Sequence, residues 1–188
     1  MALREQNPAL LVIDVQKGMN EEAYYGGNRN NRGAEANMQR ILEQWRALGL
    51  PVFHIQHSSQ NLASPLHSSR PGFEIKNEVK PLSNEPVIVK NVNSAFIGTS
   101  LKEQLDEAKI NTLVIVGLTT NHCVSTTTRM AGNYGYNTIL ISDATAAFDS
   151  VGIHGERYDA ETIHATSLAS LNGEFADIMS TERLLSEA

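Results

Sequence analysis

Three side chains with complementary chemistry follow three separate apolar runs of this sequence. The carboxylate of Asp14 directly follows one run, the amine of Lys90 directly follows another, and the thiol of Cys123 comes six residues after the glycine that ends a third. A thiolate is a strong nucleophile, a nearby cation lowers the pKa of a thiol, and a carboxylate can take up a proton and return it to a leaving group. These residue types predict nucleophilic catalysis by Cys123, assisted by Asp14 and Lys90.

Short apolar runs rich in Val and Ile supply the elements that would position these groups. The runs are continuous rather than alternating, which is typical of strands covered on both faces. Segments with a helical spacing lie between them, and the clearest ends at Gly49, a C-cap glycine. Its apolar stripe holds Met38, Ile41, Leu42, Trp45 and Leu48. The predicted strands are 9–13, 52–55, 87–89, 112–116, 138–141 and 175–179, and the predicted helices are 36–48, 99–108, 121–134, 160–171 and 181–186.

Alternating strands and helices predict right-handed β–α–β units and a parallel sheet. In an open parallel sheet, ligands bind beyond the carboxyl ends of the strands. The predicted strand ends bring Asp14, Lys90 and Cys123 to one edge of the sheet. Each residue alone has a plainer interpretation, as a turn cap, a solvated charge or a small buried side chain. Their coincidence at one edge favours a catalytic site, and this inference depends on the strand assignments.

The position of the thiol bears on its reactivity. A free thiol has a pKa of about 8.5 and is mostly protonated at neutral pH. Cys123 falls in the first turn of the helix predicted from Asn121, and both a helix N-terminus and the amine of Lys90 favour the thiolate. His122 is not expected to act as the base, because adjacent residues of a helix do not face each other. It is predicted to line the pocket instead.

Two long stretches, 18–33 and 58–80, lack a clear periodicity. Loops of this length are uncommon in compact domains and are often substrate lids, although plain surface excursions are an equal alternative. Side chains in or beside loops at the predicted edge are pocket candidates, and each is also open to a packing or surface role. The candidates are Asn20, Tyr24, Tyr25, Phe96, His122, Phe148 and Tyr158. Asp143, after the fifth predicted strand, is expected to cap a turn.

Composition restricts the class of protein. The 188 residues fit one domain spanning 1–188. A net charge of −6 without a run of Lys and Arg argues against a nucleic-acid partner. A single cysteine permits no internal disulfide and fits a reducing compartment. The sequence has neither a signal-peptide pattern at its start nor the roughly 18 apolar residues of a membrane helix, so we expect a cytoplasmic protein with no membrane partner.

Three motifs, LLVIDVQ, VIVKNVNSAF and VIVGLTTNHCV, resemble those of the isochorismatase-like cysteine hydrolase superfamily, which includes nicotinamidases and N-carbamoylsarcosine amidohydrolases. The resemblance extends over nearly the whole chain and is closest to the streptothricin-hydrolase-like branch in the middle. It implies a three-layer α/β/α fold with a doubly wound, mostly parallel six-stranded sheet. It also implies a small-molecule substrate, no cofactor, and a homo-oligomer, either a dimer or a tetramer, whose neighbouring chains can complete the pocket.

The resemblance also assigns roles within the predicted site. Asp14 is the general acid and base, Lys90 the electrostatic partner and Cys123 the nucleophile. A cis peptide between Leu118 and Thr119 turns the amide of Thr119 toward the amide of Cys123, and the two amides form an oxyanion hole. The expected reaction is hydrolysis of an amide, carbamoyl or lactam C–N bond through a thioester. The alternative is the vinyl-ether hydrolysis of isochorismate, although family members with that activity generally lack the cysteine.

A metal site is a separate question raised by the resemblance. Nicotinamidases hold a metal through an Asp-x-His pair and further histidines after the second strand. The matching stretch here, HIQHSSQNLASPLH, offers His54, His57 and His67 but no aspartate. Three histidines can bind zinc in principle. However, His54 lies inside a predicted strand, and a spacing of three residues directs it and His57 to opposite faces. We therefore predict no metal site.

Three other classes of function are weighed against the hydrolase. A nucleotide-binding or dehydrogenase domain needs a glycine-rich turn after the first strand, and DVQKGMN stands there instead. A catalytically silent interaction protein is compatible with the sequence, although three intact reactive residues argue against it. A redox-sensing thiol usually needs a resolving cysteine, which this chain lacks.

Overall fold

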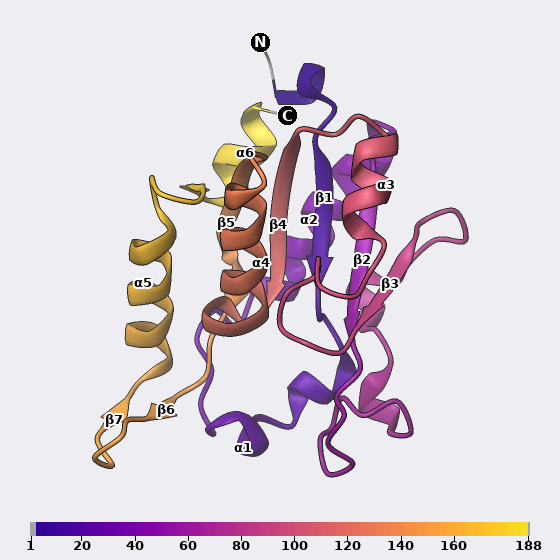
Figure 1. Ribbon diagram of the computed structural model, residues 1–188. Helices are drawn as coiled ribbons and strands as arrows, with labels where there is room; N and C mark the ends of the chain where they lie inside the picture. Colours follow the sequence, from indigo (N-terminus) through magenta and orange to yellow (C-terminus); the bar gives the residue numbers. More distant parts are fainter. Residues whose placement is uncertain (1–2, 188) are drawn as a thin grey trace.

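The computed structural model describes residues 3–187, and its centre is a six-stranded sheet (Figure 1). The strands are β1 (Ala9–Ile13), β2 (Val52–His57), β3 (Val87–Lys90), β4 (Thr112–Leu118), β5 (Asn137–Ala146) and β8 (Asp177–Met179). Their order is β3-β2-β1-β4-β5-β8, and every neighbouring pair is parallel. The predicted parallel sheet is confirmed, and each predicted strand coincides with an observed one except for a few residues at its ends.

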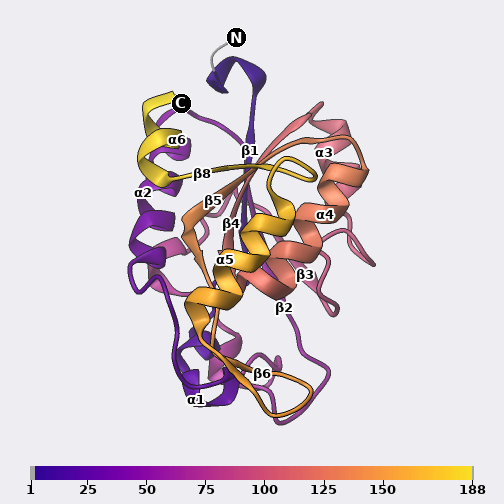
Figure 2. The same ribbon diagram turned by 90° about the vertical axis from the view of Figure 1, so that its left-hand side faces the viewer.

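Helices cover both faces of this sheet (Figure 2). On one face lie α2 (Ala34–Ala47) and α6 (Thr181–Glu187), and on the other lie α3 (Leu101–Glu107), α4 (Ser125–Asn133) and α5 (Ala160–Leu171). The expected three-layer α/β/α fold is therefore confirmed. Among residues 3–187, no helix combines the length and the hydropathy that crossing a membrane requires.

The central strand shows why its sequence is continuously apolar. In β1, Leu10 and Val12 pack into the core on the α2 side, whereas Leu11 and Ile13 pack into the core on the α3 side. All four side chains are almost completely buried. Successive residues of a strand point to opposite faces, so a strand covered on both sides needs apolar residues at every position.

Helix α2 buries one apolar stripe against the sheet. Its fully buried side chains are Met38, Ile41, Leu42 and Trp45. The predicted stripe extends to Leu48 and is wrong there, because the helix ends at Ala47 and the Leu48 side chain is 38% exposed. Gly49 follows with a φ of 66°, in the left-handed conformation that a C-cap glycine adopts without strain.

Several short elements have no counterpart among the predicted helices and strands. They are α1 (Glu22–Tyr25), the hairpin of β6 (Ser150–Val151) and β7 (Arg157–Tyr158), and 3₁₀ turns at Leu3–Gln6, Lys17–Asn20, Pro71–Phe73 and Asn77–Val79. Elements of two to four residues are too short to produce a periodicity in the sequence. Figure 1 shows α1 and the hairpin beyond the arrowhead ends of the strands, where ligands bind in this class of fold.

The predicted helix 121–134 is divided into two parts. Residues Thr120–Val124 form a π-helical turn, and α4 follows from Ser125. Turns of this wide kind occur frequently at functional sites. The irregular part of the predicted helix is the part that carries the cysteine.

The strand order reverses between β1 and β4, and in open α/β sheets ligands bind beside such a reversal. Gly117 in β4 makes this junction tight. Its φ is 134°, and a Cβ atom built there would stand 2.1 Å from the carbonyl oxygen of Ile13. The two central strands therefore approach each other at a point where only glycine fits.

Candidate active site

Asp14, Lys90 and Cys123 converge at the carboxyl ends of the central strands. Lys90 Nζ donates a hydrogen bond of 2.7 Å to Asp14 Oδ2, and both side chains are fully buried. A carboxylate oxygen of Asp14, a ring nitrogen of His57 and Cys123 Sγ lie within 4.8 Å of one another. The three reactive side chains that the sequence places at one edge therefore form one cluster, and His57 belongs to it as well.

Asp14 follows the central strand in an uncommon backbone conformation. Its φ is 53°, in the left-handed region that residues other than glycine seldom adopt. Its N–H donates to the carbonyl of Ile55 in the neighbouring strand, and its own carbonyl accepts from the N–H of Gln16. Backbone outliers of this kind cluster at active sites, where surrounding contacts hold them in place.

Lys90 is enclosed by hydrogen-bond acceptors. Besides its bond to Asp14, Nζ lies 3.0 Å from His57 Nδ1. An ammonium group only donates, so Nδ1 accepts and the His57 ring is neutral, with its proton on Nε2. Burial, followed by the charge of Lys90, lowers the pKa of His57, in agreement with a neutral ring. Gln16 fixes the backbone of His57 by accepting from its N–H and donating to its carbonyl.

An irregular segment between β4 and α4 carries the cysteine. The peptide bond between Leu118 and Thr119 is cis, at the position that the resemblance implies. The π-helical turn that follows contains Cys123, whose side chain is 9% exposed. Cys123 therefore lies at the start of a helical segment, directly beyond the central strands.

The electrostatic surroundings of Cys123 differ from the expected ones. Burial raises the pKa of the Cys123 thiol, and the Asp14 carboxylate raises it further, while the charge of Lys90 opposes both and is outweighed. The reason is that a buried site beside a carboxylate disfavours a second negative charge. The direction of this shift is opposite to the one that a helix N-terminus and a nearby lysine favour, and it agrees with a role for Asp14 as the acceptor of the thiol proton at the moment of attack.

Asp14 has the geometry of such a base. Lys90 binds its Oδ2, whereas its Oδ1 is buried and has no hydrogen-bond partner within residues 3–187. Buried polar atoms are nearly always paired, and an unpaired one calls for a functional explanation. A carboxylate oxygen of Asp14 lies within 4.8 Å of the Cys123 sulfur, so Asp14 is suited to take up the proton of the thiol.

A second histidine supports the turn from the side of α5. His164 is 5% exposed, and its Nδ1 lies 2.8 Å from Thr120 Oγ1. Its Nε2 lies 3.3 Å from Asn31 Nδ2, so it also contacts the first long loop. Sequence analysis does not identify this residue. The available signal was a polar side chain standing in line with Ala160 and Leu171 on the buried stripe of the helix.

A chamber of about 200 Å³ opens beside the reactive cluster. The first long loop contributes Met19 and Tyr25 to its wall, and the second contributes Ser64 and Leu66. Both loops therefore border the site, as lids would. His122 also lines the chamber, together with Asn93, His57 and Thr119. The His122 Nδ1 lies 3.1 Å from Thr119 Oγ1.

Three other pocket candidates lie outside the wall of this chamber. Phe96 is 6% exposed and stacks on Tyr136 in the core on the α3 side. Tyr24 is 49% exposed, and its neighbour Tyr25 lines the chamber instead, because adjacent residues of a helical turn point in different directions. Asn20 lines a separate polar cavity of about 570 Å³.

The remaining candidates have supporting or peripheral positions. The ring of Phe148 stacks on that of Tyr25 with a centroid distance of 5.1 Å. Tyr158 lies in the β6–β7 hairpin and is 42% exposed. Asp143 Oδ1 accepts hydrogen bonds from the N–H and the hydroxyl of Thr181 at the start of α6, so Asp143 is a capping residue.

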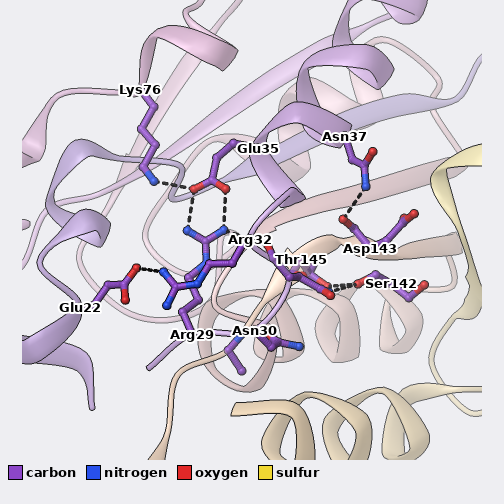
Figure 3. A network of polar contacts seen from close by, with 12 residues as sticks. Glu22, Arg29, Asn30, Arg32, Glu35, Asn37, Lys76, Ser142, Asp143 and Thr145 are labelled. Atoms are coloured by element: carbon purple, nitrogen blue, oxygen red, sulfur yellow. Dashed lines mark hydrogen bonds and ion pairs between the residues drawn. The ribbon is translucent and has the colours of Figure 1, made fainter. Parts of the chain in front are cut away.

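A buried ion cluster ties both long loops to the start of α2 (Figure 3). Glu35 accepts two hydrogen bonds from Arg29 and one from Lys76, and all three residues are at least nine-tenths buried. Burial raises the pKa of Glu35, but these hydrogen bonds outweigh it and hold the pKa at about 2. Arg29 belongs to loop 18–33 and Lys76 to loop 58–80. The cluster therefore fixes the two loops relative to each other, beside the larger cavity, which contains none of the three reactive residues.

The three histidines considered as metal ligands do not converge. His54 Nε2 lies 2.8 Å from a carboxylate oxygen of Glu85. His67 Nδ1 lies 2.8 Å from Ser69 Oγ in the second long loop. Only His57 belongs to the reactive cluster, so these histidines have separate partners and do not share a ligand.

Asp14, His57 and Cys123 nevertheless offer one group of metal-ligand side chains within residues 3–187. The ammonium of Lys90 lies 2.7 Å from Asp14 and 3.0 Å from His57, at hydrogen-bond distance from two of the three. A divalent cation bound by the same atoms would face a second positive charge at very short range. The cluster therefore fits a lysine, and it does not fit an added metal ion.

Comparisons with known proteins agree on one family. The model of the isochorismatase domain matches residues 8–183. An uncharacterized isochorismatase family protein of Bacillus subtilis (strain 168), YrdC, is 51% identical over 183 residues, which cover 97% of each chain. Streptothricin hydrolase of Streptomyces noursei is 31% identical over 144 residues, which cover 75% of this chain and 50% of that protein.

Solved structures show the same fold. A crystal structure of an isochorismatase-family protein from Chromobacterium violaceum superposes with a TM-score of 0.94 at 38% sequence identity. The superposition covers 100% of this chain and 96% of that one. The likeness therefore extends along the full length of this chain.

Proposed function

The chain belongs to the isochorismatase family of hydrolases, and from this premise we propose that it is a cysteine hydrolase acting on a C–N bond of a small molecule. One observation carries the proposal. The buried thiol of Cys123 lies beside the Asp14 carboxylate, which has one oxygen held by Lys90 and the other free. A thiol with an adjacent base is suited to acyl transfer, and the name of one relative, streptothricin hydrolase, supports hydrolysis as the reaction class.

In the first half-reaction, Cys123 Sγ attacks the carbonyl carbon of an amide. Asp14 Oδ1 takes the thiol proton as the S–C bond forms, so no free thiolate has to exist in the buried site. The carbonyl electron pair moves to the oxygen and gives a tetrahedral oxyanion. When the C–N bond breaks, Asp14 passes the proton to the leaving nitrogen, and an amine or ammonia departs from a thioester.

In the second half-reaction, a water molecule attacks the thioester carbonyl. Asp14 takes a proton from this water, and collapse of the tetrahedral intermediate breaks the C–S bond. The departing sulfur of Cys123 then recovers the proton from Asp14. One water is consumed, one C–N bond is replaced by a C–O bond, and the site returns to its starting state.

Two further groups complete this proposed cycle. Lys90 is fully buried and is not among the residues that line the chamber, so it acts on Asp14 and on the Cys123 thiol and not on the substrate. It holds the carboxylate in place and offsets its charge. We assign the oxyanion to the backbone amides of Thr119 and Cys123, donors of a kind whose individual loss slows hydrolysis by about 10²–10³-fold.

Product release from a panel of small amides tests the proposal, with wild type and Cys123→Ala run in parallel. The panel holds nicotinamide, carbamoyl compounds and a lactam, and isochorismate is tested beside them. Mass spectrometry accompanies the ammonia assay because an opened lactam frees no ammonia. We expect wild type to hydrolyse at least one compound and Cys123→Ala to hydrolyse none. Thermal unfolding of both proteins checks that the variant keeps its fold. Turnover by Cys123→Ala, or cleavage of isochorismate alone by wild type, would contradict the proposal.

A further inference from the structure

Besides Asp14 Oδ1, a second polar atom in the residues of the chamber wall has no hydrogen-bond partner within residues 3–187. The hydroxyl of Tyr25 is buried and makes no hydrogen bond within the part of the chain that the structure describes. Its ring is held in place by the stack on Phe148, with an interplanar angle of 22°. An unpaired buried hydroxyl destabilises the free protein, so its retention in a rigid position calls for a partner that arrives with a ligand.

This hydroxyl lies near the reactive groups. Burial is the main cause that raises the pKa of Tyr25, followed by the neighbouring Tyr24 and Glu21. Asp14 and Cys123 raise it further, and all three residues line the same chamber. Tyr25 therefore stays protonated across the neutral range and offers a neutral O–H donor in the chamber that contains the nucleophile.

The chamber offers no counterion to a charged substrate. Among the lining residues, Asp14 carries a charge, and the buried ammonium of Lys90 offsets it. Burial lowers the pKa of His57 and of His122, so both rings are neutral at neutral pH. The remaining side chains of the wall are uncharged, namely those of Met19, Tyr25, Ser64, Leu66, Asn93 and Thr119, besides the Cys123 thiol. A buried charge on the substrate would find no partner here.

The chamber is also small. Its volume of about 200 Å³ is below the roughly 300–1,000 Å³ of sites for drug-sized ligands. Met19 and Leu66 form an apolar part of the wall, while Ser64 and Asn93 supply polar atoms. This mixture suits a compact molecule with a few polar groups.

We infer that the chamber binds a small uncharged amide whose acyl part carries a hydrogen-bond acceptor, and that the hydroxyl of Tyr25 donates to this acceptor. The amide itself rests on the proposed function, whereas the neutral charge and the acceptor follow from the wall of the chamber. A ring nitrogen, an ether oxygen or a second carbonyl meets the requirement. A site that leaves a buried donor unpaired discriminates strongly against an analogue that lacks the matching acceptor.

Protection of Cys123 from alkylation measures binding without requiring turnover. Cys123 is the only cysteine, so modification by iodoacetamide at pH 8.5 reports on this site alone. The probes are benzamide and the three pyridinecarboxamides. The pyridinecarboxamides match benzamide in shape, and each carries one acceptor nitrogen, at the ortho, meta or para position of the ring. The proteins are wild type, Tyr25→Phe and Tyr24→Phe. The last is a matched control, because Tyr24 is the preceding residue but is 49% exposed and lies outside the chamber wall.

We expect at least one pyridinecarboxamide to protect wild type about tenfold better than benzamide. Tyr25→Phe should lose this preference while its affinity for benzamide stays the same, and Tyr24→Phe should keep it. Tyr25→Phe should also be at least as stable as wild type to heat, because it removes an unpaired buried hydroxyl and keeps the stack on Phe148. A purely structural role for Tyr25 predicts the opposite change in stability and no change in preference.

The charge requirement is tested with iodoacetamide and iodoacetate on wild type. The ratio of their alkylation rates in urea-unfolded protein gives the intrinsic preference of the thiol. In the native protein, the ratio of the iodoacetamide rate to the iodoacetate rate should be at least about tenfold larger than in the unfolded protein. The carboxylate of iodoacetate finds no cation in the chamber, whereas iodoacetamide is neutral. An equal or reversed ratio overturns this part of the inference.

The outcomes for the inference and for the proposed function are distinct. No protection by any of the four amides at millimolar concentration, or an acceptor preference that survives in Tyr25→Phe, overturns the contact with Tyr25. Amides that protect Cys123 in wild type but are never hydrolysed would contradict the hydrolase and leave the contact with Tyr25 supported.

Discussion

Lys90 Nζ and Asp14 Oδ2 lie 2.7 Å apart, and neither side chain is exposed to solvent. Each ion is the main compensation for the burial of the other, because removing a charge from water is costly unless a partner is present. The pair keeps an ionised carboxylate in a dry site, next to a thiol whose proton it is positioned to accept. Stability and the proposed chemistry therefore depend on the same contact.

Lys90→Met tests this dependence. The substitution keeps much of the side-chain volume but leaves Asp14 buried without its cation, so we expect a loss of about 3–5 kcal/mol in the free energy of unfolding, together with loss of hydrolysis. Urea denaturation followed by circular dichroism measures the first effect. Lys102→Met is the control, because Lys102 pairs with Asp106 on the exposed face of α3. Equal stability of the two variants would show that the buried pair is not a main support of the site.

The raised pKa of Cys123 predicts an alkaline-shifted alkylation profile. An ordinary thiol ionises at about pH 8.5, whereas burial and Asp14 keep the native thiol protonated beyond that value. The rate of alkylation by iodoacetamide should still be rising above about pH 9.5 in the native protein, after the urea-unfolded protein has reached its plateau. A native profile that is already flat at pH 7 would indicate a resting thiolate and contradict this assignment.

The same shift has a consequence for stability. The folded state binds the thiol proton more tightly than the unfolded state, so the protonated thiol contributes to the free energy of unfolding. This contribution is fully present below the pKa of the unfolded state and is lost as the pH rises toward the pKa of the folded state. Cys123→Ala should therefore lose less stability than wild type between pH 8 and pH 10. Thermal unfolding at a series of pH values gives the comparison.

Much of the fold follows from local patterns in the sequence. Continuous apolar runs are strands because both faces of the sheet are covered, and the carboxyl ends of parallel strands meet at one edge. That rule brings Asp14 and Lys90 together although 76 positions separate them. The segment from Gly117 to Cys123 brings the third reactive residue, Cys123, to the same edge, because β4 lies beside β1 in the sheet.

The parts that sequence does not reveal depend on contacts between distant segments. Nothing in the sequence indicates whether Tyr24 or Tyr25 lines the chamber. In the structure Tyr25 lines it, and the ring of Tyr25 stacks on Phe148. The pKa of Cys123 depends on how deeply it is buried beside a carboxylate, and a helix N-terminus alone suggests the wrong direction. The sequence shows His164 as a polar residue on the buried stripe of α5, but its contact with Thr120 in the turn that carries the cysteine is known only from the structure.

Glu35→Gln tests the cluster that fixes the two long loops. The pKa of Glu35 is held at about 2, more than two units below its ordinary value of 4.5, which corresponds to on the order of 3 kcal/mol of stability at neutral pH. A depressed folded pKa gives stability that is present above pH 4.5 and lost as the pH falls toward 2. The variant should be less stable at pH 7 by roughly this amount, and the difference from wild type should shrink below about pH 4.

Glu78→Gln is the matched control for that comparison, since Glu78 lines the same cavity but is exposed. Urea denaturation at several pH values measures both variants. If Glu35→Gln and Glu78→Gln behave alike at pH 7, the buried ion cluster does not hold the loops. Because the two loops also border the chamber, Glu35→Gln should weaken protection of Cys123 by the amide probes as well.

His164→Leu tests whether α5 positions the turn that carries Cys123. The change removes the contact with Thr120 at 2.8 Å and leaves a buried hydroxyl unpaired, so the turn should loosen. We expect alkylation of Cys123 and turnover of any amide substrate to change by about tenfold, with kcat affected more than KM, because His164 does not line the chamber. His164→Asn, which can still hydrogen-bond the threonine hydroxyl, should restore part of the effect.

A double-mutant cycle with Thr120→Val separates positioning from general destabilisation. If the two residues act through their hydrogen bond, their effects on the free energy of unfolding should be non-additive by about 0.5–3 kcal/mol. The same non-additivity should appear in the alkylation rate of Cys123, which a remote loss of stability would not produce. Additive effects in both measurements would mean that His164 supports the fold through packing alone, and that the turn is held by the adjoining strands.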